Sequence, residues 1–186
     1  KYFGGVIPAP GAEEGPDAEL KEACAKAVRD FCANMDTFHI SDACADVFTM
    51  LRRANKYIDE TEPWALAKDE EKKARLETVL YNLVESICIG ASLLESFMPS
   101  TSKNILAQLN GAKRSLEEMA QFGLYASGTK VVEKPEILFA RLDLAEVLAK
   151  VEALHPTVVE EAPAEEAENV IDIEPKAEIT YDDFAK

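Results

Sequence analysis

Motifs for metal binding and for phosphate binding are missing from this 186-residue sequence. Its four cysteines form no C-x-x-C pair, although a cysteine-rich zinc site needs closely spaced ligands. Its two histidines, His39 and His155, lie in predicted loops and outside any E-x-x-H or H-E-x-x-H pattern. No glycine-rich loop precedes a predicted helix, and no nucleophile elbow is present. We therefore predict no catalytic residue, no metal ligand and no cofactor site in this chain.

Long apolar runs are missing as well. No stretch approaches the roughly 20 consecutive apolar residues that a membrane-spanning helix needs. The sequence does not open on a basic segment followed by an apolar one, as a secretion signal would. The cysteines fall inside helical patterns and are interpreted as small buried apolar residues, a use of free thiols that is typical of a reducing compartment. The sequence therefore predicts a cytoplasmic protein that does not contact membranes.

Basic charge is scarce, and the acidic charge is unevenly distributed. The formal net charge is -15. Residues 151–186 hold eleven acidic residues and two lysines, so -9 of this charge belongs to them and -6 to residues 1–150. Non-specific electrostatic binding of RNA should therefore be weak, and any recognition of RNA has to come from a small, well-shaped site.

Apolar residues recur every three or four positions along most of the chain, which is the helical period. Asp17, Ser41 and Thr61 are candidate caps at helix starts, and Asp143 with Glu146 forms a capping-box pattern. No alternating pattern of useful length predicts a β-strand. We therefore predict an all-α helical bundle, with helices over about residues 17–35, 41–58, 61–68, 70–98, 101–109, 116–121 and 143–154.

The second of these helices is predicted to bury one stripe of apolar side chains. The members of this stripe are Cys44, Val47, Phe48, Leu51, Ala54 and Ile58.

Composition divides the chain into three parts. Residues 1–155 form the helical domain, and residues 156–178 form an acidic linker rich in Ala, Glu and Pro that should be flexible. Residues 179–186 regain apolar and aromatic character, so they are interpreted as the first strand and turn of a further domain.

Trp64 is the only tryptophan, and it lies in the first turn of a predicted helix, directly after Pro63. Tryptophan is usually largely buried, so from the residues alone a core side chain is the favoured interpretation. The functional interpretation is a ring that projects from the helix start and offers a stacking surface to an unpaired base.

The segment Asn55–Lys68, with the sequence NKYIDETEPWALAK, resembles the signature of the methionyl-tRNA synthetase anticodon-binding domain. Further segments occur in the order that this family needs. They are Lys1–Gly5, Leu93–Pro99, Leu138–Asp143 and, resembling the opening of the oligonucleotide-binding domain appended to many bacterial members, Ile179–Lys186.

The resemblance implies that Trp64 stacks on cytosine, the first base of the CAU anticodon. Stacking is tolerant of sequence, so discrimination needs contacts to the base edge, and the amino group of cytosine suits carboxylate or carbonyl acceptors. By proximity, the other candidate anticodon-binding residues are Asn55, Lys56, Asp59 and Pro63.

The resemblance also implies the partners. They are the anticodon loop of tRNA(Met) and a catalytic domain of the same polypeptide, which would use ATP to attach methionine. This chain alone should not aminoacylate tRNA and should need no cofactor of its own. Relatives often dimerise through a further C-terminal domain, so the intact protein is a candidate homodimer.

The main alternative is a non-catalytic helical module that binds proteins and whose acidic tail recruits basic partners. It would explain the net charge and the lack of catalytic motifs, and it makes Trp64 a core residue. A helical-bundle metalloenzyme is a more distant alternative, because the repeated Glu-x-x-His ligands of such sites are missing from the sequence.

Overall fold

The computed structural model describes residues 2–154, and their regular secondary structure is helical. Within these residues the only extended pairing is an isolated antiparallel bridge between Val6 and Lys130. The predicted all-α fold is confirmed. In chain order the elements are a 3-10 helix at Tyr2–Gly5, α1 (Gly15–Asp36), α2 (Ile40–Thr61), α3 (Pro63–Leu66), a 3-10 helix at Glu70–Lys72, α4 (Lys73–Leu94), α5 (Pro99–Gln108), α6 (Leu116–Met119) and α7 (Leu144–Leu154).

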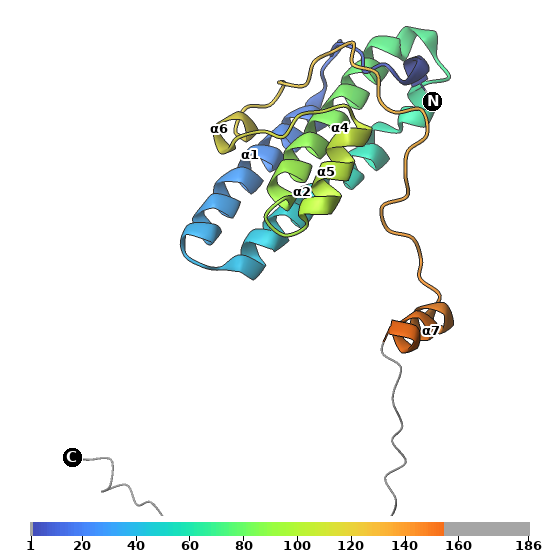
Figure 1. Ribbon diagram of the computed structural model, residues 1–186. Helices are drawn as coiled ribbons and strands as arrows, with labels where there is room; N and C mark the ends of the chain where they lie inside the picture. The colour runs from blue at the N-terminus through green and yellow to red at the C-terminus, as the bar shows by residue number, and fades with distance from the viewer. Residues whose placement is uncertain (1, 155–186) are drawn as a thin grey trace, which may run out of the picture. The chain divides into compact units, whose positions relative to one another are not determined.

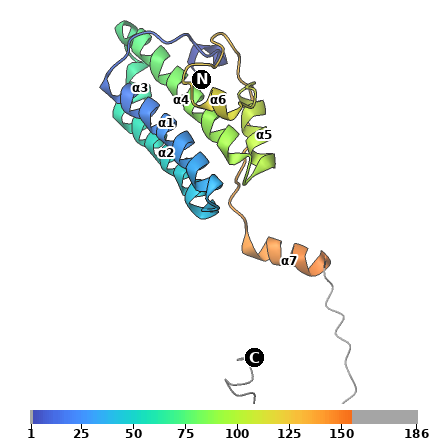
Figure 2. The same ribbon diagram turned by 90° about the vertical axis from the view of Figure 1, so that its left-hand side faces the viewer.

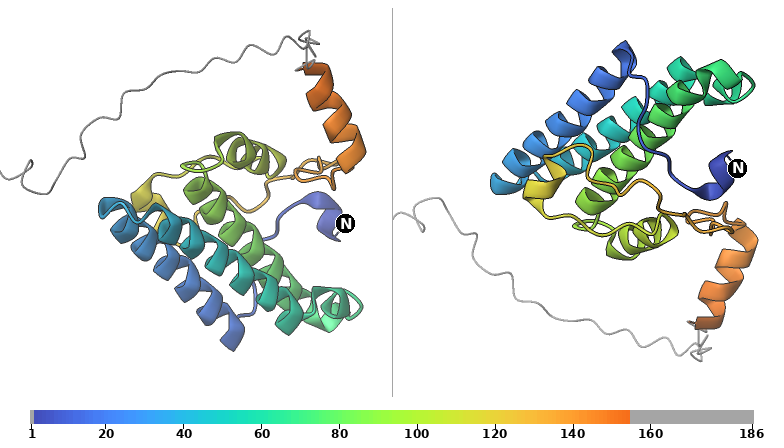
Figure 3. Two further views of the ribbon diagram at one scale, coloured as in Figure 1. Left: turned by 90° about the horizontal axis from the view of Figure 1, so that it is seen from below. Right: turned by 90° about the horizontal axis from the view of Figure 1, so that it is seen from above.

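Helix α4 is the centre of the first compact unit, which extends to Ala140. It contacts α1, α2, α3 and α5, and α1, α2 and α4 lie side by side along most of their length (Figure 1, Figure 2). The views from below and from above place α5 on the side of α4 that faces away from α2 (Figure 3). Since α4 has neighbours on several sides, its side chains are buried around most of its circumference.

By length and composition alone, the helical segment Glu70–Leu94 is long and apolar enough to cross a membrane. Most of this apolar stretch is buried inside the protein. This burial is the environment of a core helix, so the apolar character of α4 is explained by packing within the protein.

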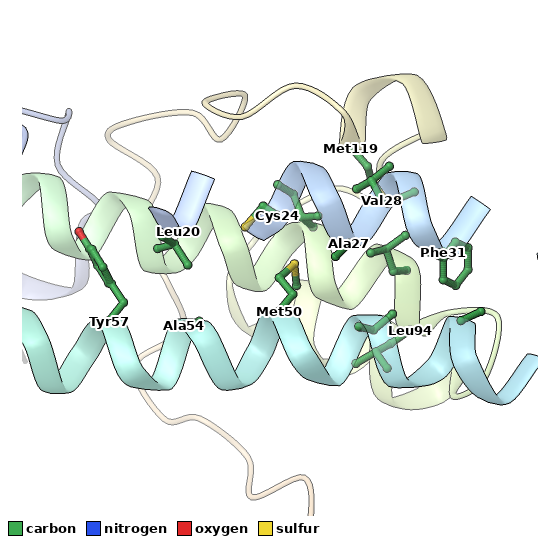
Figure 4. Packing of buried hydrophobic residues seen from close by; sticks show 14 of the residues in the cluster. Leu20, Cys24, Ala27, Val28, Phe31, Met50, Ala54, Tyr57, Leu94 and Met119 are labelled. Atoms are coloured by element: carbon green, nitrogen blue, oxygen red, sulfur yellow. The ribbon is translucent and has the colours of Figure 1, made fainter. Parts of the chain in front are cut away.

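One core cluster fills the space between α1, α2 and α4 (Figure 4). Leu20, Cys24 and Phe31 face inward from α1 and belong to the same core cluster as Met50 of α2. Gly90 permits the close approach of α4 to α2, because a Cβ at this position would lie only 2.8 Å from Cε of Met50. Burial of this apolar surface is the main source of stability for the bundle.

The buried stripe of α2 differs from the predicted one. Phe48 is 40% exposed and Ile58 is only partly buried. Val47 and Ala54 of the predicted stripe are buried, but the buried face is rotated about the helix axis from the predicted one, because α2 packs against both α1 and α4. The buried residues of α2 are Ala43, Val47, Met50, Ala54, Tyr57 and Thr61.

A buried carboxylate makes several of the hydrogen bonds that hold the irregular segment after α5 to the bundle. Glu85 of α4 is 0% exposed and accepts two hydrogen bonds from the guanidinium of Arg114, at 2.7 and 2.8 Å. It also accepts the backbone N–H groups of Gly123, Leu124 and Tyr125, at 2.6 to 2.9 Å. A carboxylate with five donors is fully satisfied without water, so it can hold a segment that has little regular structure.

Several predicted helix ends are shifted. Helix α1 begins at Gly15 with Glu14 at its N-cap, and Asp17 occupies the third helical position of a capping box. The predicted continuous helix over residues 70–98 is instead a 3-10 turn followed by α4, which ends at Leu94. Helix α5 begins directly at Pro99, because proline fits the first turn, where its missing N–H is not needed.

The second unit begins at Arg141, and its described part contains α7. Asp143 caps this helix as predicted, since its Oδ1 accepts the N–H groups of Ala145 and Glu146 at 2.9 and 3.2 Å. The predicted linker and the predicted start of a further domain lie outside the described residues. The three-part division of the chain therefore stays a prediction.

Candidate functional site

The chain turns a sharp corner between α2 and α3. Glu62 ends α2 and begins α3 in a left-handed conformation, with φ 41° and ψ 61°. Its carbonyl accepts the N–H groups of Ala65 and Leu66, at 2.8 and 3.1 Å, and so starts the new helix. The predicted capping role of Thr61 is wrong, because its hydroxyl instead donates backward to the Tyr57 carbonyl at 2.7 Å.

Trp64 lies directly after this corner, at the second position of α3. Its side chain is 47% exposed, whereas the preceding Pro63 is buried. The interpretation of Trp64 as a core residue is therefore wrong. A half-exposed indole has both a packed side that holds it and a free surface on which another ring can stack.

The other candidate residues on α2 are exposed. Asn55 and Asp59 are one helical turn apart, so they lie on the same face of the helix. Lys56 is exposed and forms an ion pair with Glu60, with 3.3 Å between its Nζ and Oε1 of Glu60. The structure thus brings an amide, a carboxylate and a half-exposed indole to the same end of the bundle. Their roles in binding stay predictions.

A buried polar network lies beneath the corner. Asp17 of α1 is 1% exposed and accepts two hydrogen bonds from Arg75 of α4, at 2.7 and 3.0 Å. The Tyr57 hydroxyl of α2 donates to the same carboxylate and accepts from Nδ2 of Asn82 at 3.4 Å. The backbone N–H of Glu14 completes the network with a bond of 2.8 Å to Asp17. Three helices are therefore tied together at this end.

The network lowers the pKa of Asp17. Burial by itself would raise the pKa, but the hydrogen bonds from Arg75 and Tyr57 stabilise the charged form and outweigh burial. Glu85 behaves in the same way, because Arg114 and the backbone N–H donors outweigh its desolvation and lower its pKa. Both carboxylates are therefore ionised in the folded protein well below neutral pH.

This shift predicts a loss of stability in acid. A group whose folded pKa is lowered adds stability above its unfolded pKa, about 3.9 for Asp and 4.3 for Glu. The stability is lost as the pH falls from there through the folded pKa. We expect the urea midpoint of Asp17→Asn to depend less steeply on pH than that of the wild-type chain between about pH 4.5 and 3. Equal slopes would show that Asp17 is not linked to folding in this way.

Two of the four thiols are buried and poorly suited to nucleophilic chemistry. Burial raises the pKa of Cys24 to about 12 and that of Cys88 to about 11. All four cysteines are free. Between Tyr2 and Leu154, no group of three or more His, Cys, Asp and Glu side chains is arranged to hold a metal ion.

Comparison with known proteins gives a consistent result. Residues 7–152 match the family model described as the anticodon binding domain of methionyl tRNA ligase. The chain is 46% identical over its full length to the methionine–tRNA ligase of Clostridium perfringens, and 42% identical to that of Caldanaerobacter subterraneus. It covers 28% of each of these relatives.

A solved structure shares the fold. The apo methionyl-tRNA synthetase of Mycobacterium tuberculosis superimposes with a TM-score of 0.69 and 29% identity, over 77% of this chain and 29% of that one. The fold therefore belongs to the class of helical domains carried by aminoacyl-tRNA ligases. Since the family model matches most of the chain, the chain belongs to the anticodon-binding domain family of methionyl-tRNA ligases.

The network beneath the corner is not apparent from the sequence. The local pattern assigns Asp17 only to a helix cap, and it does not single out Tyr57 or Arg75. Tyr57 and Arg75 are 40 and 58 positions from Asp17 along the chain, so no local pattern could pair them. A usable signal is the apolar spacing of Tyr57 from Ala54 and Met50, which places it on the buried face of α2.

Proposed function

We propose that this chain is the anticodon-reading module of a methionine–tRNA ligase. Trp64 would stack on the first anticodon base, and Asn55 and Asp59 would offer acceptors to its edge. Pro63 would hold the indole from beneath, and Lys56 would lie at the margin of the site. The observation that carries the proposal is the half-exposed indole at a fixed helix corner, in a chain of this family.

The chain spans 28% of the length of its relatives, so the reaction of the whole protein belongs to the proposal too. A catalytic domain of the same polypeptide would bind ATP and methionine and transfer the amino acid to tRNA(Met). The bundle would hold the anticodon at a set distance from that domain. We place this protein in the cytoplasm, where translation uses it. Homodimerisation through a further C-terminal domain stays a prediction.

The charge of the bundle supports recognition by shape and stacking. With -6 over residues 1–150, general attraction to RNA is weak. Base stacking on an aromatic ring contributes about 1–3 kcal/mol per base and does not depend on a basic surface. A module of this kind should bind an isolated anticodon loop modestly, and most of its selectivity should come from one or two bases.

The test uses Trp64 as its own reporter, since it is the only tryptophan. An RNA hairpin with the loop sequence CAU should quench its fluorescence through stacking. A hairpin in which only the first of these bases is changed should bind more weakly, because edge contacts are worth about 1–3 kcal/mol of discrimination. Titration of the chain with both hairpins measures the difference. Identical quenching and affinity would refute the assignment of Trp64 to the first anticodon base.

A further inference from the structure

We propose that Tyr57 is a positioning residue for Trp64: it fixes the helix corner that presents the indole to the anticodon. This inference rests on the proposed function and extends it to a side chain that is 0% exposed and cannot touch RNA. Figure 4 shows the Tyr57 side chain reaching from α2 toward α4, with its hydroxyl at the far end.

The hydroxyl of Tyr57 ties α2 to two other helices. It donates to Oδ1 of Asp17 on α1 and accepts from Nδ2 of Asn82 on α4 at 3.4 Å. Asp17 and Asn82 are each 1% exposed, so water does not compete for these bonds. Arg75 holds the same carboxylate from α4 and also reaches Glu14, with 3.2 Å between its Nε and Oε2. The last turns of α2 are therefore fixed both in their rotation about the helix axis and in their position along it relative to α1 and α4.

The backbone carries this restraint from Tyr57 to the corner. The Tyr57 carbonyl accepts the Thr61 hydroxyl at 2.7 Å, and the next carbonyl, that of Ile58, accepts the N–H of Glu62 at 3.0 Å. Glu62 is the residue in the left-handed conformation. A non-glycine residue stays in this sparsely populated region only when its surroundings over-determine it. The network beneath α2 supplies one restraint, and the burial of Pro63 supplies another.

A fixed corner favours binding because the ring needs no ordering when the base arrives. Immobilising a side chain or a loop on association costs free energy, and a group that is already held in its bound position avoids that cost. Trp64 follows Glu62 by two residues, so small changes at Glu62 would reorient the whole indole. Loss of the Tyr57 hydroxyl should therefore weaken RNA binding without removing any group that touches RNA.

The test compares two buried tyrosines. Tyr57→Phe removes the hydroxyl at the corner. Tyr81→Phe is the matched control, because the Tyr81 hydroxyl donates to the Tyr125 carbonyl at 2.9 Å and belongs to the other core cluster. With a fluorescently labelled CAU hairpin, we expect Tyr57→Phe to weaken binding about 2- to 10-fold, the equivalent of one net hydrogen bond. Tyr81→Phe should bind as the wild-type chain does.

Two further readouts separate positioning from general destabilisation. In the absence of RNA, the fluorescence anisotropy of Trp64 should fall in Tyr57→Phe and not in Tyr81→Phe. In a Trp64→Ala background, Tyr57→Phe should weaken hairpin binding no further. If Tyr57→Phe does not fold, Thr61→Val removes the next bond toward the corner, and the same results are expected of it.

The outcomes distinguish this inference from the proposed function. If Tyr57→Phe matches Tyr81→Phe in both anisotropy and hairpin affinity, the positioning role of Tyr57 is overturned, whatever Trp64 does. If Trp64→Ala itself binds the CAU hairpin as tightly as the wild-type chain, the proposed function fails. In that second case a lower anisotropy of Tyr57→Phe would still show that Tyr57 fixes the corner.

Discussion

Trp64→Ala should weaken binding of a CAU hairpin by about 1–3 kcal/mol, roughly 5- to 150-fold in affinity, and should change the stability of the chain much less. The loss in affinity follows from removal of the stacking surface. The small loss in stability follows from the exposure of the indole, which is 47%. A fully buried tryptophan would instead cost about 3–5 kcal/mol of unfolding free energy on truncation to alanine.

Phe48→Ala is the matched control for this prediction. Phe48 is also a half-exposed aromatic residue, at 40%, and lies on α2 well before the corner. Its removal should leave hairpin affinity unchanged. Hairpin titrations measure the RNA affinity of both variants, and urea unfolding measures their stability. A Trp64→Ala chain that keeps its RNA affinity but unfolds easily would return Trp64 to a structural role.

Glu85→Ala should have the largest effect on stability, a loss of about 3–5 kcal/mol in the free energy of unfolding. The carboxylate is completely buried, and its loss leaves the Arg114 guanidinium and three backbone N–H groups without their acceptor. An uncompensated buried charge is more costly than the lost contact alone. Urea unfolding monitored by circular dichroism would measure the change.

Glu95→Ala is the control for the Glu85 prediction. Glu95 also pairs with a basic side chain, that of Lys113, but both partners are substantially exposed. Such pairs contribute about 0–1 kcal/mol, so this variant should unfold almost as the wild-type chain does. Similar losses for Glu85→Ala and Glu95→Ala would show that burial does not set the cost of losing the carboxylate. Hydrogen exchange at Gly123 to Tyr125 should also accelerate in Glu85→Ala, since their acceptor is removed.

Helix content and order are predictable from the sequence because they depend on local information. The three- and four-residue spacing of apolar side chains is enough to identify α1, α2 and α4. The ends of the helices are predicted less accurately than their presence and order. The pattern makes Asp17 the cap of α1, but Asp17 lies inside the helix, because Glu14 takes the cap position and Arg75 pairs with Asp17 in the interior. A partner 58 residues away cannot be inferred from a local cap pattern.

The candidate site is predictable in part. The family resemblance selects Trp64, but the residues alone favour a buried ring. Whether an indole at a helix start packs inward or projects outward depends on how that helix start packs against the rest of the bundle. That depends on the left-handed turn at Glu62 and on the contacts of Pro63, which form only when α3 meets α4.

The sequence by itself determined an all-α protein, most of its helices, an acidic region after residue 150 and the segment that carries Trp64. These follow from periodicity, composition and short motifs, which act over a few residues. Only the tertiary structure decided which face of α2 is buried, how Asp17, Tyr57 and Arg75 meet, and that Trp64 is half exposed. Burial and charge pairing are set by residues that are distant along the chain, so they are decided only when the helices pack.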